Sequence, residues 1–494
     1  MRRAIDRFPN ESFDVLIVGG GITGACVARD AARRGLKVAL VERGDFASAT
    51  SAHNSKLIHG GLRYLRNFEL GLVRESLRER RIWQRIAPHL VSPLPFLVPL
   101  YGGGFKARAT LSAGLTLYDL LSFDRGRVMP GHSWLSADEA RRREPLLDSP
   151  DLDGAFCYHD AQMASPERLA LECLADADAQ GAAIANYVAA ERLLVRDGKV
   201  EGCTVRDTTP AASGGMAREP ASSFDIRAKT TLVAAGPWAD IFLAQALGHP
   251  SSHKLMRSKG IHVLVPAMTH KFALTMATAH GHFFVLPWRG HTLLGTTDTA
   301  FTGNPDDVGV SETDIADFFA FINKHLPNAR LARDKVEFFY AGLRPLVDDG
   351  SGDTYDASRK SELIDHGKDD GLDGLFSAIG GKWTTSRHLA ETVVDRLAEK
   401  LDATTQACDT ATAMLPGLRH PEPLEARVHT VIRDEMALTL EDVVMRRTEL
   451  GQFGPPPQAT LDTVSRAMAQ DLGWSEERRQ SEIAALAHLY ETRP

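Results

Sequence analysis

The chain is poor in cysteine, with only Cys26, Cys157, Cys173, Cys203 and Cys408 among 494 residues. No two of them have the CxxC spacing that a zinc ribbon or a dithiol redox pair needs. This small, odd set is typical of a protein from a reducing compartment and excludes a small disulfide scaffold. We therefore expect no metal site.

Long hydrophobic runs and an excess of basic residues are also missing. No run of about 18 apolar residues exists, so no segment is expected to cross a membrane as a helix. The N-terminal sequence MRRAIDRFPNESFD lacks the apolar core of a secretory signal. The 57 Lys and Arg residues face 64 Asp and Glu residues, a net charge of −7, which disfavours a general nucleic-acid binder.

What the chain does have is an ordinary globular composition, 43% hydrophobic and 24% charged, which excludes a wholly disordered chain and a collagen. Its length predicts roughly two to four domains. A chain of this size has a core large enough to enclose a large cofactor.

The strongest local motif begins at residue 13. Residues 13–18, FDVLIV, are typical of a buried parallel strand, and the sequence GGGITG follows at residues 19–24. A helix is expected over residues 25–34, where Gly35 ends it, and a second strand over residues 36–41. Strand, GxGxxG turn, helix and strand make up the pattern of a dinucleotide-binding unit.

The glycines of this turn have separate roles in that pattern. Gly19 permits the tight turn, Gly21 lets the backbone approach a pyrophosphate, and Gly24 lets the helix pack closely on the strand. The helix N-terminus then holds the phosphates, and the acid at Glu42 takes a ribose hydroxyl. A plain turn without a ligand is the alternative. The combination favours a dinucleotide but does not choose FAD over NAD.

Residues 47–65, ASATSAHNSKLIHGGLRYL, contain a second and more specific pattern. Further segments follow it in order along the chain: AAGPW at 234–238, KGIH at 259–262, GTTD at 295–298, GLRPL at 342–346, GGKWTT at 380–385 and LEDVVMRRT at 440–448. With these seven segments, the sequence resembles the FAD-dependent glycerol-3-phosphate dehydrogenase family over nearly its whole length.

The resemblance implies an α/β fold. A Rossmann-type FAD-binding domain is interleaved with an antiparallel-sheet substrate domain, as in D-amino-acid oxidases, and a C-terminal helical domain follows. We expect the FAD-binding domain at residues 13–88, 152–247 and 372–401, with the substrate domain at 89–151 and 248–371 and the helical domain at 415–494. The helical domain looks shorter than in many family members.

FAD is the cofactor that the resemblance implies. Small hydroxylated residues in the 47–65 segment can bond the ribityl chain and phosphates, and the helix expected over 384–401 presents its N-terminal amides to the flavin. The residues expected to contact FAD are Gly19, Gly21, Ile22, Thr23, Gly24, Glu42, Arg43, Thr50, Ser51, Ser55, Lys56, Leu57, His59, Val188, Ala235, Gly236, Trp238, Gly381, Lys382, Trp383 and Thr384.

The resemblance also implies oxidation of sn-glycerol 3-phosphate to dihydroxyacetone phosphate, with hydride transfer to flavin N5. A phosphate clamp favours arginine, which pairs bidentately with phosphate oxygens, and a proton acceptor favours histidine. Surface ion pairs and structural histidines are the alternatives for such residues. The expected substrate-binding residues are Arg63, Tyr64, Arg344, Arg359 and Lys382, and the expected catalytic residues are His262, Arg344 and His59, with His262 as the base.

The family passes its electrons either to quinone or, in oxidases, to oxygen, and we expect quinone. An oxidase remains an alternative, as does another polyol phosphate such as erythritol 4-phosphate. An FAD-binding interaction module without turnover and an amine oxidase are less favoured.

Residues 93–127 mix apolar side chains with Lys106, Arg108, Arg125 and Arg127. Such a segment can lie on an anionic lipid surface, or it can be a core helix with a basic edge. We expect a cytoplasmic protein and leave open a peripheral contact with the cytoplasmic face of the inner membrane. A homodimer is left open too.

Overall fold

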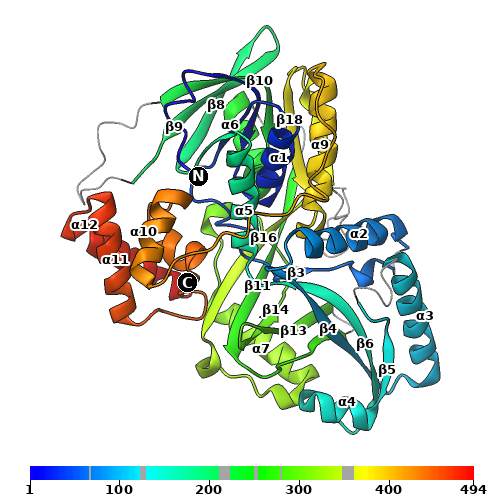
Figure 1. The fold of residues 1–494 in the computed structure, drawn as a ribbon. Coiled ribbons are helices and arrows are strands. Elements are labelled where there is room, and N and C mark those ends of the chain that lie inside the picture. Colours follow the sequence, from blue (N-terminus) through cyan, green and yellow to red (C-terminus); the bar gives the residue numbers. More distant parts are fainter. Residues whose placement is uncertain are drawn as a thin grey trace.

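A computed structural model describes residues 1–65, 68–122, 129–210, 223–249, 254–278, 281–347 and 361–493. Two β-sheets form its centre, one in the upper half and one in the lower half of Figure 1, and C-terminal helices lie against both. This arrangement confirms the expected α/β class with a second, mainly antiparallel sheet and a C-terminal helical part.

The first sheet carries the predicted dinucleotide-binding unit. Most neighbouring strands on its main path pair in parallel, and antiparallel pairing occurs at one edge and where a hairpin joins a central strand. The strand order is β17 (Ser361–Asp365), β18 (Leu375–Gly380), β10 (Ser223–Val233), β1 (Ser12–Val18), β2 (Val38–Val41) and β7 (Ala183–Ala185), with β9 (Lys199–Asp207) joining β10 to β8 (Val188–Arg196).

Three helices pack together over this sheet: α1 (Ile22–Arg33), α5 (Pro166–Ala179) and α9 (Ser386–Lys400). Helix α5 begins where the sequence predicts it, because Ser165 accepts a hydrogen bond from the Arg168 amide at 3.1 Å and Pro166 occupies the first helical position. Helix α1 begins at Ile22, three residues earlier than expected, so Gly24 lies inside the helix and not before it.

The second sheet is mostly antiparallel and curves below the first. Its strand order is β15 (Thr299–Ala300), β11 (Leu255–Pro266), β14 (His291–Gly295), β13 (Gly281–Trp288), β12 (Ala273–Thr278), β4 (Val91–Tyr101), β6 (Leu152–Met163) and β3 (Leu57–Ile58), while β16 (Phe338–Val347) pairs with β11 and β5 (Ser133–Ser136) with β6. Helix α7 (Glu312–His325) packs Ile315, Phe318 and Ile322 against the inner residues Phe283 and Val285 of this sheet.

Sheet membership differs from the expected domain ranges at three strands. Strands β3 and β6 belong to the second sheet, although they fall in the ranges 13–88 and 152–247, and β17 belongs to the first sheet, although it falls in 248–371. The reason is pairing between distant segments: β6 is antiparallel to β4 over the whole of β4. Strand propensity reveals neither partner nor sheet, so a domain boundary inside a run of strands is not visible locally.

The remaining helices border the two sheets. They are α2 (Leu70–Ile86), α3 (Gly104–Ser122), α4 (Ala137–Arg143), α6 (Ala239–Leu247) and α8 (His366–Asp369). Short 3-10 turns cover Leu62–Leu65, Pro145–Leu147, Gly236–Trp238, Pro305–Asp307, Pro327–Ala329, Arg333–Lys335, Trp383–Thr385 and His488–Tyr490. Residues 93–127, expected as one surface segment, comprise most of β4 and all of α3; Arg125 and Arg127 lie outside the described residues.

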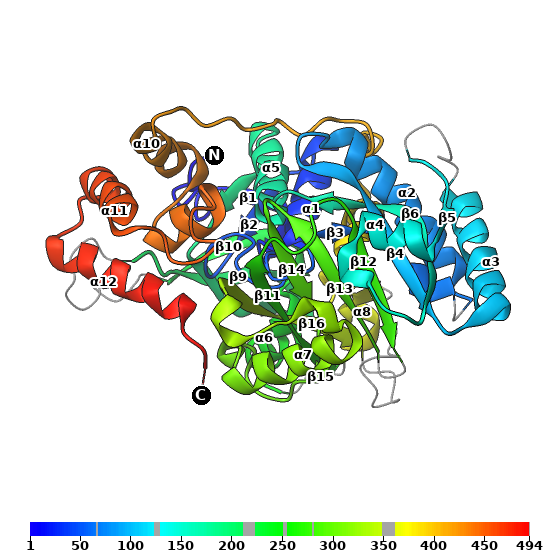
Figure 2. The ribbon, with the colours of Figure 1, turned by 90° about the horizontal axis from the view of Figure 1, so that it is seen from below.

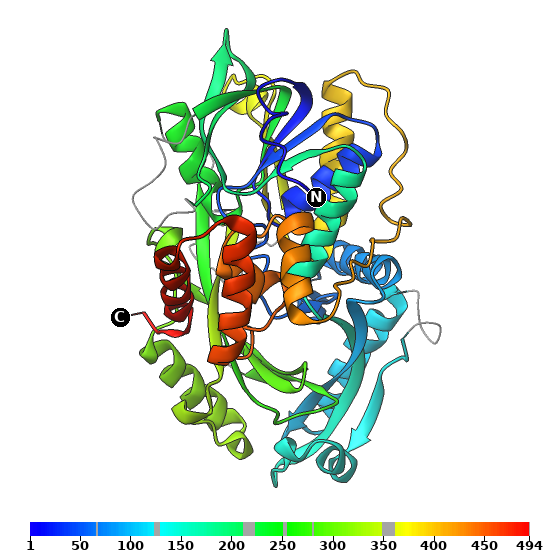
Figure 3. The same ribbon diagram turned by 60° about the vertical axis from the view of Figure 1, so that its left-hand side comes forward.

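The C-terminal part consists of α10 (Leu424–Glu435), a π-helical turn (Asp442–Arg447), α11 (Gln458–Leu472) and α12 (Glu476–Ala487). These elements share a small core that includes Val431, Val464 and Leu486. Figure 3 shows the helices side by side across the level where the two sheets meet. In Figure 2 they lie at the opposite side of the molecule from α3. Within the described ranges, no helix is long and apolar enough to cross a membrane.

Candidate functional site

A cavity of about 1370 Å³ is lined by residues of both sheets. From the first sheet come Val18 and Val41, and from the second come Phe96, Thr275 and Arg344. The cavity is therefore a single space that the fold builds from segments hundreds of residues apart.

The glycine-rich turn forms part of the cavity lining. Gly19 has a φ of +117°, and a Cβ there would lie 2.5 Å from the Ala234 carbonyl oxygen. A Cβ on Gly24 would lie only 1.9 Å from the Gly19 carbonyl oxygen. Both positions therefore require glycine, because the turn is packed against its own helix and against the end of β10.

Glu42 holds the next loop. Its two carboxylate oxygens accept hydrogen bonds from the Gly20 amide at 2.7 Å and the Gly44 amide at 2.9 Å. Burial raises the pKa of Glu42 above its ordinary value, and these two amides act against that rise. A carboxylate in this position can still accept a further hydrogen bond from a ligand hydroxyl on its remaining lone pairs.

Arg43 and Trp238 meet at the cavity wall. The Arg43 guanidinium lies 4.6 Å from the centre of the Trp238 ring and forms an ion pair with Asp306. The indole Nε1 of Trp238 donates to the same Asp306 carboxylate at 2.9 Å. Sequence reasoning predicted Arg43 and Trp238 individually but missed Asp306, which joins them.

The 47–65 segment is tied to its surroundings by short-range polar contacts. Ser51 Oγ accepts from the Ile22 amide at 2.8 Å, and the Trp383 indole donates to the Ser51 carbonyl at 3.2 Å. The His59 amide donates to Thr384 Oγ1 at 3.2 Å. These contacts fix the segment between the start of α1 and the residues before α9, as its predicted cofactor role requires.

The cavity lining also contains two cationic side chains, Lys382 and Arg344. Lys382 Nζ lies 2.8 Å from Ser76 Oγ and 4.1 Å from the centre of the Tyr64 ring. Arg344 donates to Ser258 Oγ at 3.0 Å and to Thr296 Oγ1 at 2.9 Å. Lys382 and Arg344 come from segments that are separate in both sequence and fold, and both side chains line the cavity.

His262 lies behind the cavity wall. It is 2% exposed, its ring stacks on Tyr340, and its Nε2 lies 2.9 Å from Ser55 Oγ, which does line the cavity. Burial lowers the pKa of His262 well below its ordinary value, and the nearby charges of Arg344 and Lys56 lower it further. His262 is thus a neutral imidazole near pH 7 that can reach the cavity through Ser55.

Lys56 also lies away from the cavity. Its Nζ is buried, forms an ion pair with Glu167 at 2.9 Å and donates to the Ala52 carbonyl at 2.8 Å. This pairing satisfies the charge within the protein and gives Lys56 a structural role in the 47–65 segment.

Most of the predicted site residues do line this cavity. They are Gly19, Gly21, Ile22, Thr23, Glu42, Arg43, Thr50, Ser51, Ser55, Leu57, His59, Tyr64, Val188, Ala235, Gly236, Trp238, Arg344, Gly381, Lys382, Trp383 and Thr384. Gly24, Lys56 and His262 are described but are not part of its lining. Arg359 and the side chain of Arg63 lie outside the described residues.

Sequence reasoning missed an apolar group in the lining, formed by Phe96, Val98, Leu111, Tyr158 and Phe284. Phe96 and Val98 alternate along β4 and so share one face of it, a signal that is visible in the sequence. The alternation does not say that this face meets the cavity. Thr296, Thr297 and Asp298 of the GTTD segment also line it, although only their motif was noted.

Comparison with known proteins agrees with this geometry. The sequence pattern of the family described as "FAD dependent oxidoreductase" matches residues 14–396, and that of the "C-terminal domain of alpha-glycerophosphate oxidase" matches residues 376–479. The chain is 37% identical over 436 residues to a glycerol-3-phosphate dehydrogenase of Synechocystis sp., covering 86% of this chain and 77% of that protein. It is 34% identical over 552 residues to a probable mitochondrial glycerol-3-phosphate dehydrogenase of Caenorhabditis elegans, covering 96% and 73%.

A similar solved structure is that of the glycerol-3-phosphate dehydrogenase from Bacillus halodurans complexed with FAD. It superposes with a TM-score of 0.76 at 26% identity and covers 99% of this chain and 96% of that chain. The likeness therefore extends over both sheets and the C-terminal helices.

Proposed function

We propose that this chain, which belongs to the FAD-dependent oxidoreductase family and within it to the FAD-dependent glycerol-3-phosphate dehydrogenases, oxidises sn-glycerol 3-phosphate to dihydroxyacetone phosphate. One observation carries the proposal: a single cavity is lined both by a dinucleotide-binding turn and by the cations Arg344 and Lys382. That arrangement suits a phosphorylated substrate held next to a dinucleotide cofactor.

The residues at the glycine-rich end fit FAD. The N-cap residue of α1, Gly21, supplies no side-chain cap, and the first turn contains no acidic group. Ser51 Oγ accepts from the Ile22 amide, and the N-terminus of α1 is compatible with a pyrophosphate. A Cβ on Gly21 would approach only Ser51 Oγ, at 3.1 Å, which leaves the backbone open towards the cavity. When bound, FAD supplies the hydride acceptor, flavin N5, for the hydrogen on C2 of the substrate.

Arg344 and Lys382 would bind the substrate phosphate or its oxygens, and Arg63 and Arg359 remain predictions for the same clamp. The C2 hydroxyl must also lose a proton. His59 lines the cavity and can accept it directly, whereas the predicted base His262 can accept it only through Ser55 Oγ. Because the pKa of His262 is lowered, its imidazole is neutral and able to take a proton, but it holds that proton weakly.

The substrate can be tested on the FAD-loaded protein under anaerobic conditions. Mixing with sn-glycerol 3-phosphate should bleach the visible flavin absorbance within the turnover time, and erythritol 4-phosphate should bleach it more slowly. Faster bleaching by erythritol 4-phosphate would move the proposal to that substrate, and no bleaching with either would contradict it.

We propose quinone as the electron acceptor. The apolar part of the cavity lining supports this, because it includes Phe96 and Val98 of β4 and extends to Leu111 of α3. An apolar ring compound gains favourable burial there. The test compares anaerobic reduction of a soluble quinone analogue with peroxide release in air. Peroxide formation as the faster reaction would favour the oxidase alternative.

We also propose that α3 lies on an anionic membrane surface. Phe105 is 86% exposed and Leu120 is 58% exposed, although both are large apolar residues, and the exposed cations Lys106 and Arg108 lie on the same helix. Exposed apolar side chains beside basic ones are typical of interfacial helices. The membrane contact would bring quinone to the apolar end of the cavity.

Vesicle flotation tests this contact. The double variant Lys106→Glu/Arg108→Glu should lose most binding to vesicles that contain phosphatidylglycerol. The control Arg196→Glu/Lys199→Glu reverses two exposed cations in the β8–β9 hairpin at the top of Figure 1 and should bind like the wild type. Equal flotation of wild type and the α3 variant would contradict the proposal.

A further inference from the structure

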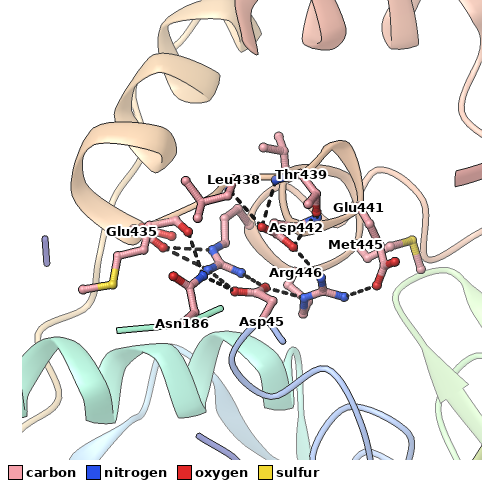
Figure 4. Close-up of polar contacts among 12 residues, drawn as sticks. Asp45, Asn186, Glu435, Leu438, Thr439, Glu441, Asp442, Met445 and Arg446 are labelled. Atoms are coloured by element: carbon pink, nitrogen blue, oxygen red, sulfur yellow. Dashed lines mark hydrogen bonds and ion pairs between the residues drawn. The ribbon is translucent and has the colours of Figure 1, made fainter. Parts of the chain in front are cut away.

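The C-terminal segment LEDVVMRRT, residues 440–448, contacts the cofactor-binding half of the molecule from outside the cavity. Figure 4 shows its Arg446 directed at Asp45, which follows strand β2. Arg446 Nε donates to Asp45 Oδ2 at 2.5 Å, and Arg447 Nη2 donates to Asp45 Oδ1 at 2.8 Å. A second nitrogen of Arg447 also bonds Asp45 Oδ2, so the carboxylate is held by two guanidinium groups.

These groups are withdrawn from water. The Asp45 side chain is 1% exposed and the Arg447 side chain 0%. Burial acts to raise the pKa of Asp45, but the two guanidinium groups outweigh it and lower that pKa to about 2. Arg446 is balanced further by Glu441 at 2.6 Å and by Asp442 at 2.8 Å. Asp45 is therefore a buried anion that depends on the C-terminal domain for its partners.

Asp45 ends a loop that faces the cavity on its other side. Glu42, Arg43 and Gly44, the residues just before it, all line the cavity. The loop is paired with the start of β8, where the Val188 amide donates to the Glu42 carbonyl at 2.8 Å and the Tyr187 amide donates to the Gly44 carbonyl at 2.9 Å.

The C-terminal domain holds this second segment as well. The Tyr187 hydroxyl donates to Asp442 Oδ1 at 2.7 Å. The Asn186 amide nitrogen donates to Asp45 at 3.0 Å and to the Met436 carbonyl at 2.9 Å. Both segments that position Glu42 are thus anchored from outside by the same domain.

We propose that Arg446 and Arg447 are positioning residues for the cofactor: through Asp45 they fix the Glu42–Gly44 loop in the shape that holds the adenosine half of FAD. The physical reason is preorganisation. A loop that is already ordered loses less conformational entropy when it binds its ligand, so docking of the C-terminal domain increases the affinity for FAD. The inference concerns FAD alone and does not depend on which polyol phosphate is oxidised.

The dissociation constant of FAD is the direct measurement, obtained by titrating apoprotein and following the quenching of flavin fluorescence. Arg447→Gln should raise this constant at least tenfold and speed FAD release from the holoenzyme. The matched control is Glu449→Gln, which removes a different ion pair of the C-terminal domain, with Arg289 of the second sheet. That pair is partly exposed and shares no residue with the Asp45 pairs, so the control should bind FAD like the wild type.

If Arg447 only stabilises the fold, FAD binding and docking of the C-terminal domain are independent, and amide exchange in α10–α12 does not respond to FAD. If the two sites are coupled, FAD must in turn strengthen docking of the C-terminal domain. Amide exchange in α10–α12 should therefore slow on FAD addition in the wild type and in Glu449→Gln, and should respond less in Arg447→Gln. The double variant Asp45→Asn/Arg447→Gln leaves no unpaired buried charge, so its affinity should lie closer to wild type than that of Arg447→Gln.

A folded Arg447→Gln protein with the wild-type dissociation constant would overturn the proposal. If this variant does not fold, Arg447→Lys decides the question, because lysine keeps the buried charge and loses the bidentate fork. It should raise the dissociation constant roughly three- to tenfold. An unchanged constant in Arg447→Lys would overturn the proposal equally.

Discussion

The two ends of the cavity are built in different ways. The dinucleotide end uses residues 19–24 and Glu42, which one strand–helix–strand unit brings together within a short stretch of chain. The proposed substrate end uses His59, Tyr64, Arg344 and Lys382, which all line the cavity and come from the 47–65 segment, from β16 and from the residues just before α9. The first end is thus a local structure, and the second exists only after two sheets have assembled.

The difference shows which interactions each end depends on. At the dinucleotide end, backbone amides would bind the cofactor, and glycines without side chains let the backbone approach it, so close packing is critical. At the substrate end, the charged groups of lysine and arginine lie at the ends of long, flexible side chains. Each group must therefore be held by partners such as Ser76 for Lys382 and Ser258 for Arg344. Substitutions should therefore separate FAD binding from substrate turnover.

The largest effect is expected for Arg344→Ala. Removing one partner of a hydrogen-bonded charge pair that substrate binding buries, here Arg344 with the phosphate, costs about 2–5 kcal/mol, or roughly 30- to 5,000-fold in kcat/KM for sn-glycerol 3-phosphate. The FAD dissociation constant should stay within about twofold of wild type. Steady-state kinetics and flavin titration measure the two quantities. The kcat/KM of Arg344→Lys should lie between those of the wild type and Arg344→Ala, because lysine keeps the charge without the bidentate geometry. An unchanged kcat/KM would remove Arg344 from the substrate end.

Gly24→Ala should affect the opposite end. The added Cβ would meet the Gly19 carbonyl oxygen at 1.9 Å, so the turn must shift. We expect the free energy of unfolding to fall by about 3 kcal/mol, at the upper end of overpacking effects, together with loss of FAD. Gly71→Ala in α2 is the control, because a Cβ there meets nothing within 4 Å and alanine favours a helix. Retention of FAD in Gly24→Ala at wild-type stability would contradict the packing argument.

The two histidines that stack on Tyr340, His53 and His262, should respond to pH with the opposite sign to Glu42. Burial lowers the pKa of His53 from 6.5 to about 4, so below pH 6.5 the unfolded chain binds a proton that the folded protein does not. Stability is therefore lost as pH falls from 7 to 5, on the order of 2 kcal/mol for this group, and His262 adds in the same direction. The raised pKa of Glu42 has the reverse effect, because the folded protein then binds the extra proton.

Urea unfolding of the apoprotein at pH 7, 6 and 5 measures this dependence. His53→Gln should flatten the loss of stability between pH 7 and pH 5, whereas Glu42→Gln should leave the loss in place or steepen it. A wild-type stability that does not fall between pH 7 and pH 5 would contradict the lowered pKa of His53.

The smallest effect is expected for Lys382→Met. Its ammonium group contacts Ser76 and the Tyr64 ring and lines the cavity, so its loss should raise KM for sn-glycerol 3-phosphate about tenfold, or about 1.4 kcal/mol, and should change kcat less. Lys368→Met removes an exposed lysine of α8 and serves as the control. If both variants keep the wild-type KM, Lys382 has no part in substrate binding.

Local patterns predicted the elements that depend only on neighbouring residues. The glycine turn, the capped helix α5 and the helix after GGKWTT all form where their residues place them. Strand pairing between distant segments was not predictable in this way, which is why β6 was included in the expected FAD-binding range although it pairs with β4 in the second sheet. The position of His262 was not predictable for the same reason. Its motif is recognisable, but only packing against Tyr340 and Ser55 puts its side chain behind the cavity wall.

The sequence by itself determined the dinucleotide-binding turn and the family, because glycine spacing and short ordered motifs are properties of contiguous residues. Only the tertiary structure decided which charged groups meet. Lys56 pairs with Glu167, and Asp45 pairs with Arg446 and Arg447, about 400 residues further along the chain. The physical reason is burial: a charge removed from water must be paired, and its partner is whichever opposite charge the fold brings within hydrogen-bonding distance.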